Sequence, residues 1–249
     1  KGIRAGELKA ICVTEMNYSS GESVSFFEGD ESVEEWRRYR RTGVSAKLSL
    51  EHLMASAAIP GIFPAAKVGA DFYADGALRQ VAPISPALHL GADRIFVIGV
   101  SGNRNPVHWA KRAAPAKHSP SIAQVFGHLF NSAFIDSLEG DLEHLERVND
   151  LLKLIPEEVR DKEGVNLKPV ETMVISPSKE LDKLAGRKIR YMPKSVRVFL
   201  RSAGGTNKGG GAATTSYLLF EKPYIDELIE LGYKDTMWER EKIQDFFEV

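Results

Sequence analysis

The stretch from Ser49 to Ala77 constrains the fold of this chain more than any other part of the sequence. Ser49 favours the N-cap position of a helix, and Pro60 with Gly61 ends the helical pattern that follows. After this bend the sequence predicts a strand or a hairpin that ends at an aspartate. The apolar residues of the predicted helix are Leu50, Leu53, Met54 and Ala57.

The aspartate at the end of this stretch, Asp75, is followed at once by Gly76 and Ala77. An acid beside a residue that tolerates unusual backbone angles can be held at a strand end, where it faces a site rather than the core. The alternative is a turn aspartate that accepts a hydrogen bond from its own backbone. We assign a turn role to Asp71, in a predicted hairpin turn, and to Asp93, between a helix and a strand.

The next segment predicts a helix followed by a buried strand. Pro83 and Pro86 lie near the start of a short helical pattern, which Gly91 closes. The pattern from Arg94 to Val100 is almost unbroken in its apolar character. A strand without polar alternation is usually covered on both faces, as in a parallel sheet flanked by helices. We therefore predict the α/β class rather than a β-sandwich.

Strands are predicted before the segment from Ser49 to Val100, and mainly helices after it. The pattern from Glu7 to Phe27 predicts a hairpin or a strand pair, and that from Val170 to Pro177 a short buried strand. Asn103 to Lys117 lacks periodicity and is interpreted as a surface loop. Helical patterns cover Ile122 to Leu152, Ser195 to Ser202, Ser216 to Gly232 and about Thr236 to Phe247.

Composition excludes several classes of protein. The 33 Lys and Arg residues nearly balance the 34 Asp and Glu residues, which argues against a dedicated nucleic-acid-binding protein. The single cysteine, Cys12, excludes an internal disulfide and a cysteine-based zinc site, and we interpret it as a small buried apolar residue. No run reaches the roughly 18 apolar residues that a membrane-spanning helix needs.

The most basic part of the sequence lies between Val33 and Lys47. One interpretation is an interfacial patch that meets anionic lipid headgroups, because Trp36 and Tyr39 are interleaved with the charges. The other is a solvated helical turn or loop, since short charge runs are usually just surface. The basic residues are Arg37, Arg38, Arg40, Arg41 and Lys47.

Three further patterns give little support for a catalytic or binding role. Gly204 to Gly211 invites a phosphate-loop interpretation, but Lys208 is followed by Gly209 rather than Ser or Thr, and a helix precedes it; we predict a flexible surface loop. No serine stands in a G-x-S-x-G pattern. The histidines show no metal-binding pair, so we predict no metal and no cofactor. They are His52, His89, His108, His118, His128 and His144.

Two neighbouring segments, ASAAIPGIFPA and FYADGALRQVAPISPALHLGADRIFVIGV, together resemble the second half of the patatin-like phospholipases. In that family a Pro-Gly-x-Phe-Pro bend leads to a strand, an Asp-Gly-Gly or Asp-Gly-Ala motif, a short helix and a buried strand. The tail TSYLLFEKPYIDELIELGYKDT and the segment DLEHLERVN are similar to helices of bacterial members. The resemblance covers most of the chain.

The resemblance implies one patatin-like domain over residues 1–249, with a three-layer α/β/α sheet and a C-terminal helical layer. It also implies a serine-aspartate dyad, and Asp75 matches the dyad aspartate. The serine elbow and the Gly-rich oxyanion loop have no counterpart in this sequence. Because both lie upstream in the family, we expect this chain to be the downstream part of a longer protein. The turn residues that support the motif are Gly76, Ala77, Pro60 and Gly61.

An exposed aspartate has a pKa near 3.9 and is a weak base at neutral pH, so such a site would need burial. We expect apolar neighbours of Asp75 to provide it, and we expect the first three of them to line a lipid pocket as well. These neighbours are Ile59, Ile62, Phe63, Phe72 and Tyr73.

The resemblance predicts a lipid acyl hydrolase that acts on fatty acyl esters through an acyl-enzyme, with this chain inactive by itself. The alternative is a non-catalytic protein that binds lipid or a membrane surface on the same scaffold, through the basic patch and exposed aromatics such as Trp109. We expect a cytoplasmic or peripheral-membrane location, peripheral membrane contact, and no nucleic-acid partner.

Overall fold

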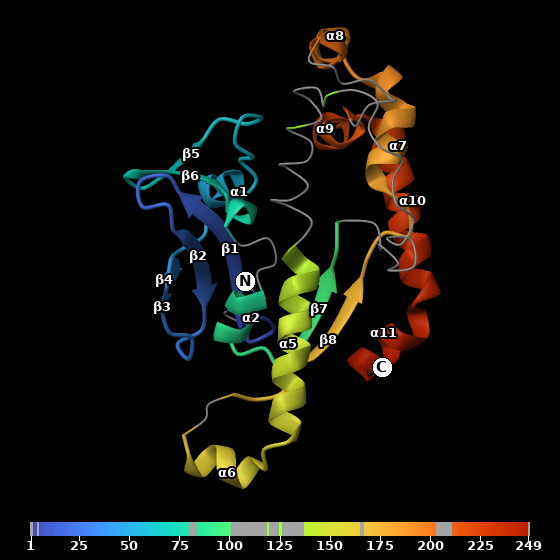
Figure 1. Cartoon of the computed structure of the whole chain (residues 1–249). Coiled ribbons are helices and arrows are strands. Elements are labelled where there is room, and N and C mark those ends of the chain that lie inside the picture. Colours follow the sequence, from blue (N-terminus) through green and yellow to red (C-terminus); the bar gives the residue numbers. More distant parts are fainter. Residues whose placement is uncertain are drawn as a thin grey trace. The chain divides into compact units, whose positions relative to one another are not determined.

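The structure is a computed structural model, and it describes residues 2–3, 5–79, 84–100, 119, 125, 137–164, 167–202 and 211–248. The chain divides into two compact units, residues 1–95 with 136–171 and residues 96–135 with 172–249. The first unit contains a six-stranded sheet (Figure 1). The predictions for residues 103–117 and 204–210, and for residues 122–136 apart from residue 125, lie outside the described residues.

The six-stranded sheet has the order β3-β4-β2-β1-β6-β5. Neighbouring strands run antiparallel, except that β2 and β4 are parallel. The predicted strand pair between Glu7 and Phe27 is confirmed as β1 and β2, and the α/β class is confirmed by this mixed sheet with its flanking helices. The strands are β1 (Ala10–Asn17), β2 (Ser23–Gly29), β3 (Trp36–Arg38), β4 (Arg41–Ser45), β5 (Ala66–Val68) and β6 (Asp71–Asp75).

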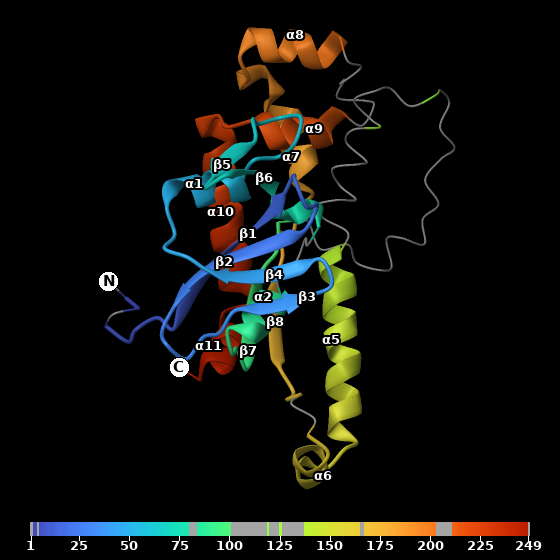
Figure 2. The same ribbon diagram turned by 90° about the vertical axis from the view of Figure 1, so that its left-hand side faces the viewer.

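One edge of this sheet is the hairpin β3–β4 (Figure 2), so the interpretation of residues 33–47 as a helical turn or loop is wrong. Packing of Trp36 explains the difference. Its ring stacks on Phe27 at 5.3 Å and on His89 at 4.8 Å between centroids. A Cβ on Gly43 would lie 2.3 Å from the Trp36 ring, so glycine leaves the space that the indole occupies.

Helix α1 (Leu50–Ser56) packs against β1, β5 and β6 and begins with the predicted N-cap, Ser49, in a capping box with His52. Its buried residues are His52 and Ala55, whereas the predicted apolar residues Leu50, Leu53 and Met54 are exposed. The helix therefore covers the sheet with His52 and Ala55 rather than with its large apolar side chains. The core beneath it is formed by Val24, Phe26, Ala55 and Tyr73.

After β6 the chain forms the short helix η1 (Gly76–Leu78), then α2 (Ile84–His89) and β7 (Arg94–Ile98). Strand β7 pairs with β8 (Glu171–Ile175) in a separate two-stranded sheet. This confirms the strand predicted for residues 170–177, but the prediction that it is buried is wrong, since no residue of β8 is buried. Ile95 is buried, but Ile98 is 75% exposed. The prediction that residues 94–100 are covered on both faces is therefore wrong, because a pair of strands shields little of its own surface.

The remaining described elements are helices. The prediction that a helix ends at Gly232 is wrong. Helix α10 continues through Gly232, because burial of Tyr224 and Leu231 outweighs the roughly 1 kcal/mol that a helical glycine costs. In the described part of the chain, no helix is long and apolar enough to cross a bilayer. The helices are α5 (Ser137–Lys153), α6 (Glu157–Lys162), α7 (Leu181–Lys188), η2 (Ile189–Tyr191), α8 (Lys194–Ser202), α9 (Gly211–Leu218), α10 (Lys222–Trp238) and α11 (Arg240–Phe247).

Candidate functional site

The structure places Asp75 at the last position of β6, where it caps η1. Its side-chain Oδ1 accepts a hydrogen bond from the Ala77 backbone N–H at 2.9 Å. Its own backbone N–H donates to the Ala58 carbonyl oxygen at 3.0 Å. The backbone of Asp75 is therefore anchored to the end of the α1 segment, and its carboxylate is oriented by the turn at Ala77.

Gly76 is required at this turn because the chain approaches β1 very closely. A Cβ on Gly76 would lie 2.4 Å from the Thr14 carbonyl oxygen, well inside van der Waals contact. The same oxygen accepts a hydrogen bond from the Ser56 hydroxyl at 3.0 Å, so it is anchored to α1. The sequence argument invoked unusual backbone angles for Gly76, but its φ is not positive. Close packing is the actual reason for glycine.

Burial raises the pKa of Asp75, and the hydrogen bond from Ala77 opposes this rise. Tyr73 is buried and lies on the same face of β6 as Asp75, as predicted. Phe72 lies on the opposite face and is 51% exposed, so its predicted role in desolvating Asp75 is wrong. The carboxylate of Asp75 is thus a stronger base than that of an exposed aspartate.

The bend after α1 connects this helix to the strand that carries Asp75. The backbone N–H groups of Ile62 and Phe63 both donate to the Ile59 carbonyl oxygen, at 3.1 and 2.9 Å. Gly61 adopts a φ of 78°, which favours glycine. Pro60 is half-buried beside it. The lipid-pocket role of Ile59, Ile62 and Phe63 stays a prediction.

Sequence reasoning missed Glu15, which the structure places directly opposite Asp75 in the antiparallel register of β1 and β6. Glu15 is fully buried, and neither carboxyl oxygen has a hydrogen-bond partner among the described residues. Burial raises its pKa to about 8. A signal was available, because strand alternation puts Glu15 on the same face as the apolar Val13.

The basic patch forms the tip of the β3–β4 hairpin, where Arg37, Arg38, Arg40 and Arg41 are all exposed. Tyr39 at the turn is 86% exposed, and the Arg40 guanidinium lies 5.6 Å from the centroid of its ring. This arrangement presents several cations and one aromatic ring to solvent, which suits an anionic surface.

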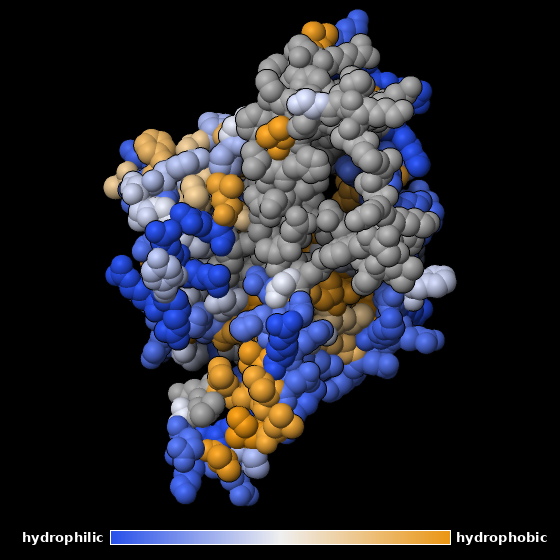
Figure 3. Space-filling view, viewed as in Figure 1, coloured by the Kyte–Doolittle hydropathy of each residue, from blue (hydrophilic) through white to orange (hydrophobic). Residues whose placement is uncertain are grey.

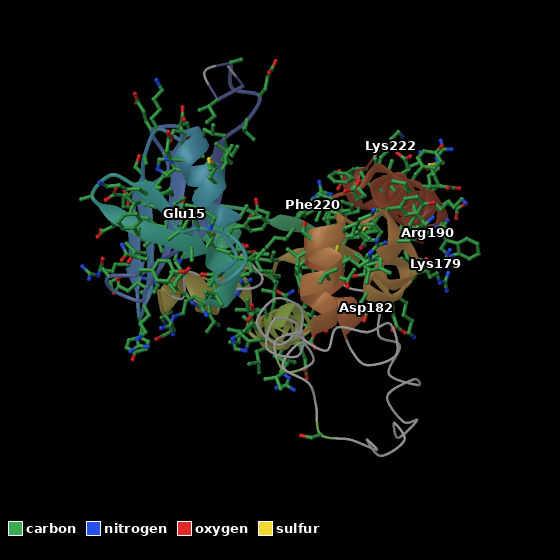
Figure 4. The ribbon with its side chains drawn as sticks, turned by 90° about the horizontal axis from the view of Figure 1, so that it is seen from above. Glu15, Lys179, Asp182, Arg190, Phe220 and Lys222 are labelled. Atoms are coloured by element: carbon green, nitrogen blue, oxygen red, sulfur yellow. The ribbon has the colours of Figure 1, made fainter. Side chains whose placement is uncertain are left out.

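A concave surface of about 390 Å³ lies between α7 and α10, in the second unit. Its charged residues form ion pairs, such as Lys188 with Glu227 at 3.1 Å. Figure 4 labels Lys179 beside α7 and Lys222 at the start of α10. Among the described residues, no group of histidine, cysteine and acidic side chains could hold a metal ion.

One comparison with known proteins finds a match, in the region that contains Asp75. Residues 11–88, which run from β1 into α2, match the family model of the patatin-like phospholipases. Neither a search of curated proteins nor a search of solved structures finds a match. The match covers less than a third of the chain, so it shows that residues 11–88 are similar to part of the patatin-like phospholipases.

Proposed function

We propose that this chain is part of a carboxylic ester hydrolase that cleaves fatty acyl esters, with Asp75 as the general base of a serine-aspartate dyad. The observation that supports the proposal best is the geometry of Asp75. Two hydrogen bonds hold it at a strand end, and its burial raises its pKa toward neutrality. A base performs best when its pKa approaches the working pH.

In the proposed reaction a serine hydroxyl attacks the ester carbonyl while Asp75 accepts the hydroxyl proton. The acyl–oxygen bond of the lipid breaks, the alcohol leaves with that proton, and an acyl-serine ester remains. Water then attacks the acyl-serine with Asp75 as base again, which releases the fatty acid and restores the serine. The negative charge on the carbonyl oxygen needs backbone donors in both steps.

The sequence of residues 1–249 contains no G-x-S-x-G pattern, so we propose that the nucleophile lies outside this chain. The chain by itself should then show no turnover of a short-chain nitrophenyl ester. Hydrolysis that is lost in Asp75→Ala would contradict this part of the proposal.

In a longer protein that carries the nucleophile, Asp75→Asn should lower kcat/KM about 10²- to 10⁴-fold, the usual contribution of a positioned base. Asp71→Asn is the matched control. Asp71 is an aspartate of the same strand that accepts hydrogen bonds from Asn17 and Ser19 instead. The assignment of Asp75 fails if both variants retain the parent rate.

A second candidate function, binding of a membrane surface without catalysis, is favoured by the basic hairpin tip and by an apolar patch at the α5–α6 connection. Figure 3 shows hydrophobic side chains gathered over the lower end of α5. Leu154 there is 78% exposed. Exposed apolar groups of this kind mark protein or membrane contacts. The other members of the patch are Leu151, Val159 and Leu167.

Vesicle sedimentation tests this second function. We expect binding to vesicles that contain phosphatidylglycerol, weak binding to phosphatidylcholine alone, and release at high salt. Replacing Arg38 and Arg40 by Gln should weaken binding by about 2 kcal/mol, roughly thirtyfold. The matched control replaces Lys222 and Lys234, which form ion pairs along α10, by Gln. Equal losses in both double variants would contradict a specific role of the hairpin tip.

A further inference from the structure

Glu15 is the most unusual charged residue among those that the structure describes. It lies in the interior of the sheet-bearing unit (Figure 4), with no exposed surface. Both of its carboxyl oxygens lack a hydrogen-bond partner in the described part of the chain. An isolated ionised carboxylate in such a place is very unfavourable, so the group binds a proton instead.

The register of the strands defines the neighbours of Glu15. It lies opposite Val24 of β2 on one side and opposite Asp75 of β6 on the other. Side chains of directly opposed residues share a face, with Cβ atoms about 4.5–5.5 Å apart. Val24 belongs to the core cluster with Ala55 of α1, so this is the face that the helix covers.

The titratable groups on the elements packed against this face are few. Strand β6 contributes Asp71, Tyr73 and Asp75, which share a face by strand alternation. Helix α1 contributes His52, whose ring packs on Phe26 at 4.9 Å between centroids. The residue of β2 opposite Glu15 is the apolar Val24. Asp75 is therefore the one carboxylate directly paired with Glu15 in the described sheet.

Two carboxyl groups on directly opposed residues repel each other when both are ionised, and the environment decides which of them keeps a proton. Asp75 is half-buried and accepts a hydrogen bond from Ala77, which stabilises its ionised form. Glu15 is fully buried and has no such donor. This difference in environment favours the protonated acid at Glu15 and the ionised base at Asp75.

We propose that Glu15 and Asp75 are an electrostatically coupled carboxyl pair that holds one proton at neutral pH, and that this proton stays on Glu15. The pair leaves Asp75 ionised, as a base must be, and it lets α1 cover Glu15 without a buried charge. The catalytic meaning rests on the proposed function, but the pairing itself does not.

Carbon-13 NMR of the side-chain carboxyl groups in the full chain tests the pairing directly. In the unsubstituted protein we expect Glu15 to titrate at about pH 8, well above Asp75. In Asp75→Asn, which keeps an oxygen acceptor for Ala77, the Glu15 step should move down by about one pH unit or more, since a neighbouring negative charge is lost. In Glu15→Gln, the Asp75 step should stay in place, because a neutral amide replaces a neutral acid.

Three outcomes would overturn the proposal: a Glu15 step in the ordinary carboxyl range, a Glu15 step unmoved by Asp75→Asn, or an Asp75 step that falls in Glu15→Gln. Glu31→Gln, at an exposed loop position, is the matched control and should move neither step. The titrations measure no turnover. The carboxyl pairing can therefore hold even if the serine-aspartate dyad is wrong, and the dyad can hold even if the pairing is wrong.

Discussion

The six-stranded sheet carries charged groups in two contrasting places. At the β1–β6 pair, Glu15 and Asp75 are withdrawn from water, and burial raises the pKa of both. At the β3–β4 edge, four arginines and Tyr39 stand in solvent around a tight turn. Burial at the β1–β6 pair alters the protonation of its carboxyl groups, whereas the side chains at the β3–β4 edge are exposed to solvent.

This contrast separates two kinds of function on one sheet. A buried carboxyl pair can serve proton transfer, because its protonation differs from that of exposed acids at the same pH. An exposed basic hairpin can attract an anionic surface, because its arginine side chains lie in solvent. Substitutions at the β1–β6 pair and at the β3–β4 edge should therefore change folding stability by different amounts and with a different dependence on pH.

The largest effect on folding stability is expected for Glu15→Gln. The folded-state pKa of Glu15 is about 8 against an ordinary value of 4.5. Between these values the unfolded chain loses the proton and the folded chain keeps it, so stability falls as pH rises, by about 1.4 kcal/mol per pH unit. Below pH 4.5 Glu15 contributes no such loss, and above pH 8 the loss is complete.

Glu15→Gln should therefore be more stable than the parent protein at pH 8, by up to an amount on the order of 5 kcal/mol, and similar to it at acid pH. Urea unfolding from pH 5 to pH 8.5 measures this difference. Glu31→Gln is again the control and should follow the parent curve. A parent stability that does not decline over this range relative to Glu15→Gln contradicts the burial of a neutral Glu15.

A smaller loss is expected for Gly76→Ala. The added Cβ would lie 2.4 Å from the Thr14 carbonyl oxygen, which is backbone and is itself bonded to Ser56. Overpacking of this kind costs about 1–3 kcal/mol. Gly232→Ala is the matched control: nothing lies near its Cβ in α10, and a gain of about 0.5–1 kcal/mol is expected. Thermal unfolding of both variants measures the two effects, and equal shifts would show that the Gly76 turn is not tightly packed.

The smallest effect is expected at the hairpin edge, for Arg40→Gly. Arg40 has a φ of 56°, a left-handed conformation that costs a non-glycine residue about 1–2 kcal/mol. Removing this strain while losing one exposed side chain should stabilise the protein by less than about 1 kcal/mol, at any pH between 5 and 8. Chemical denaturation at two pH values measures it. A strong pH dependence would mean that the edge charges are not simply solvated.

Much of the first unit was predictable from local patterns. Ser49 as an N-cap, the bend at Pro60 and Gly61, the hairpin that ends at Asp75, and Gly91 at the end of α2 all follow from short-range rules of backbone geometry. The β3–β4 hairpin was not predictable in this way. It depends on Trp36, which stacks on a ring from β2 and a ring from α2 that are distant in the sequence.

The candidate site shows the same division. The Asp75-Gly76 pair could be found in the sequence because an acid before a glycine at a strand end is a local signal. The sequence could not show that Glu15 is the partner of Asp75. The two residues are far apart in the chain, and only the register of β1 and β6 brings them together. The reason for Gly76 also escaped the sequence, because close approach to Thr14 is a tertiary contact.

The sequence by itself determined the α/β class, the β1–β2 strand pair, the succession of helix, bend and strand from Ser49 to Asp75, and the aspartate around which the candidate site is built. Local propensities and turn chemistry suffice for these, because each depends on residues a few positions apart. Only the tertiary structure decided which charges lose contact with water. Glu15 became a buried acid because α1 covers its face of the sheet, and the arginines of the hairpin stayed exposed because they lie at its edge.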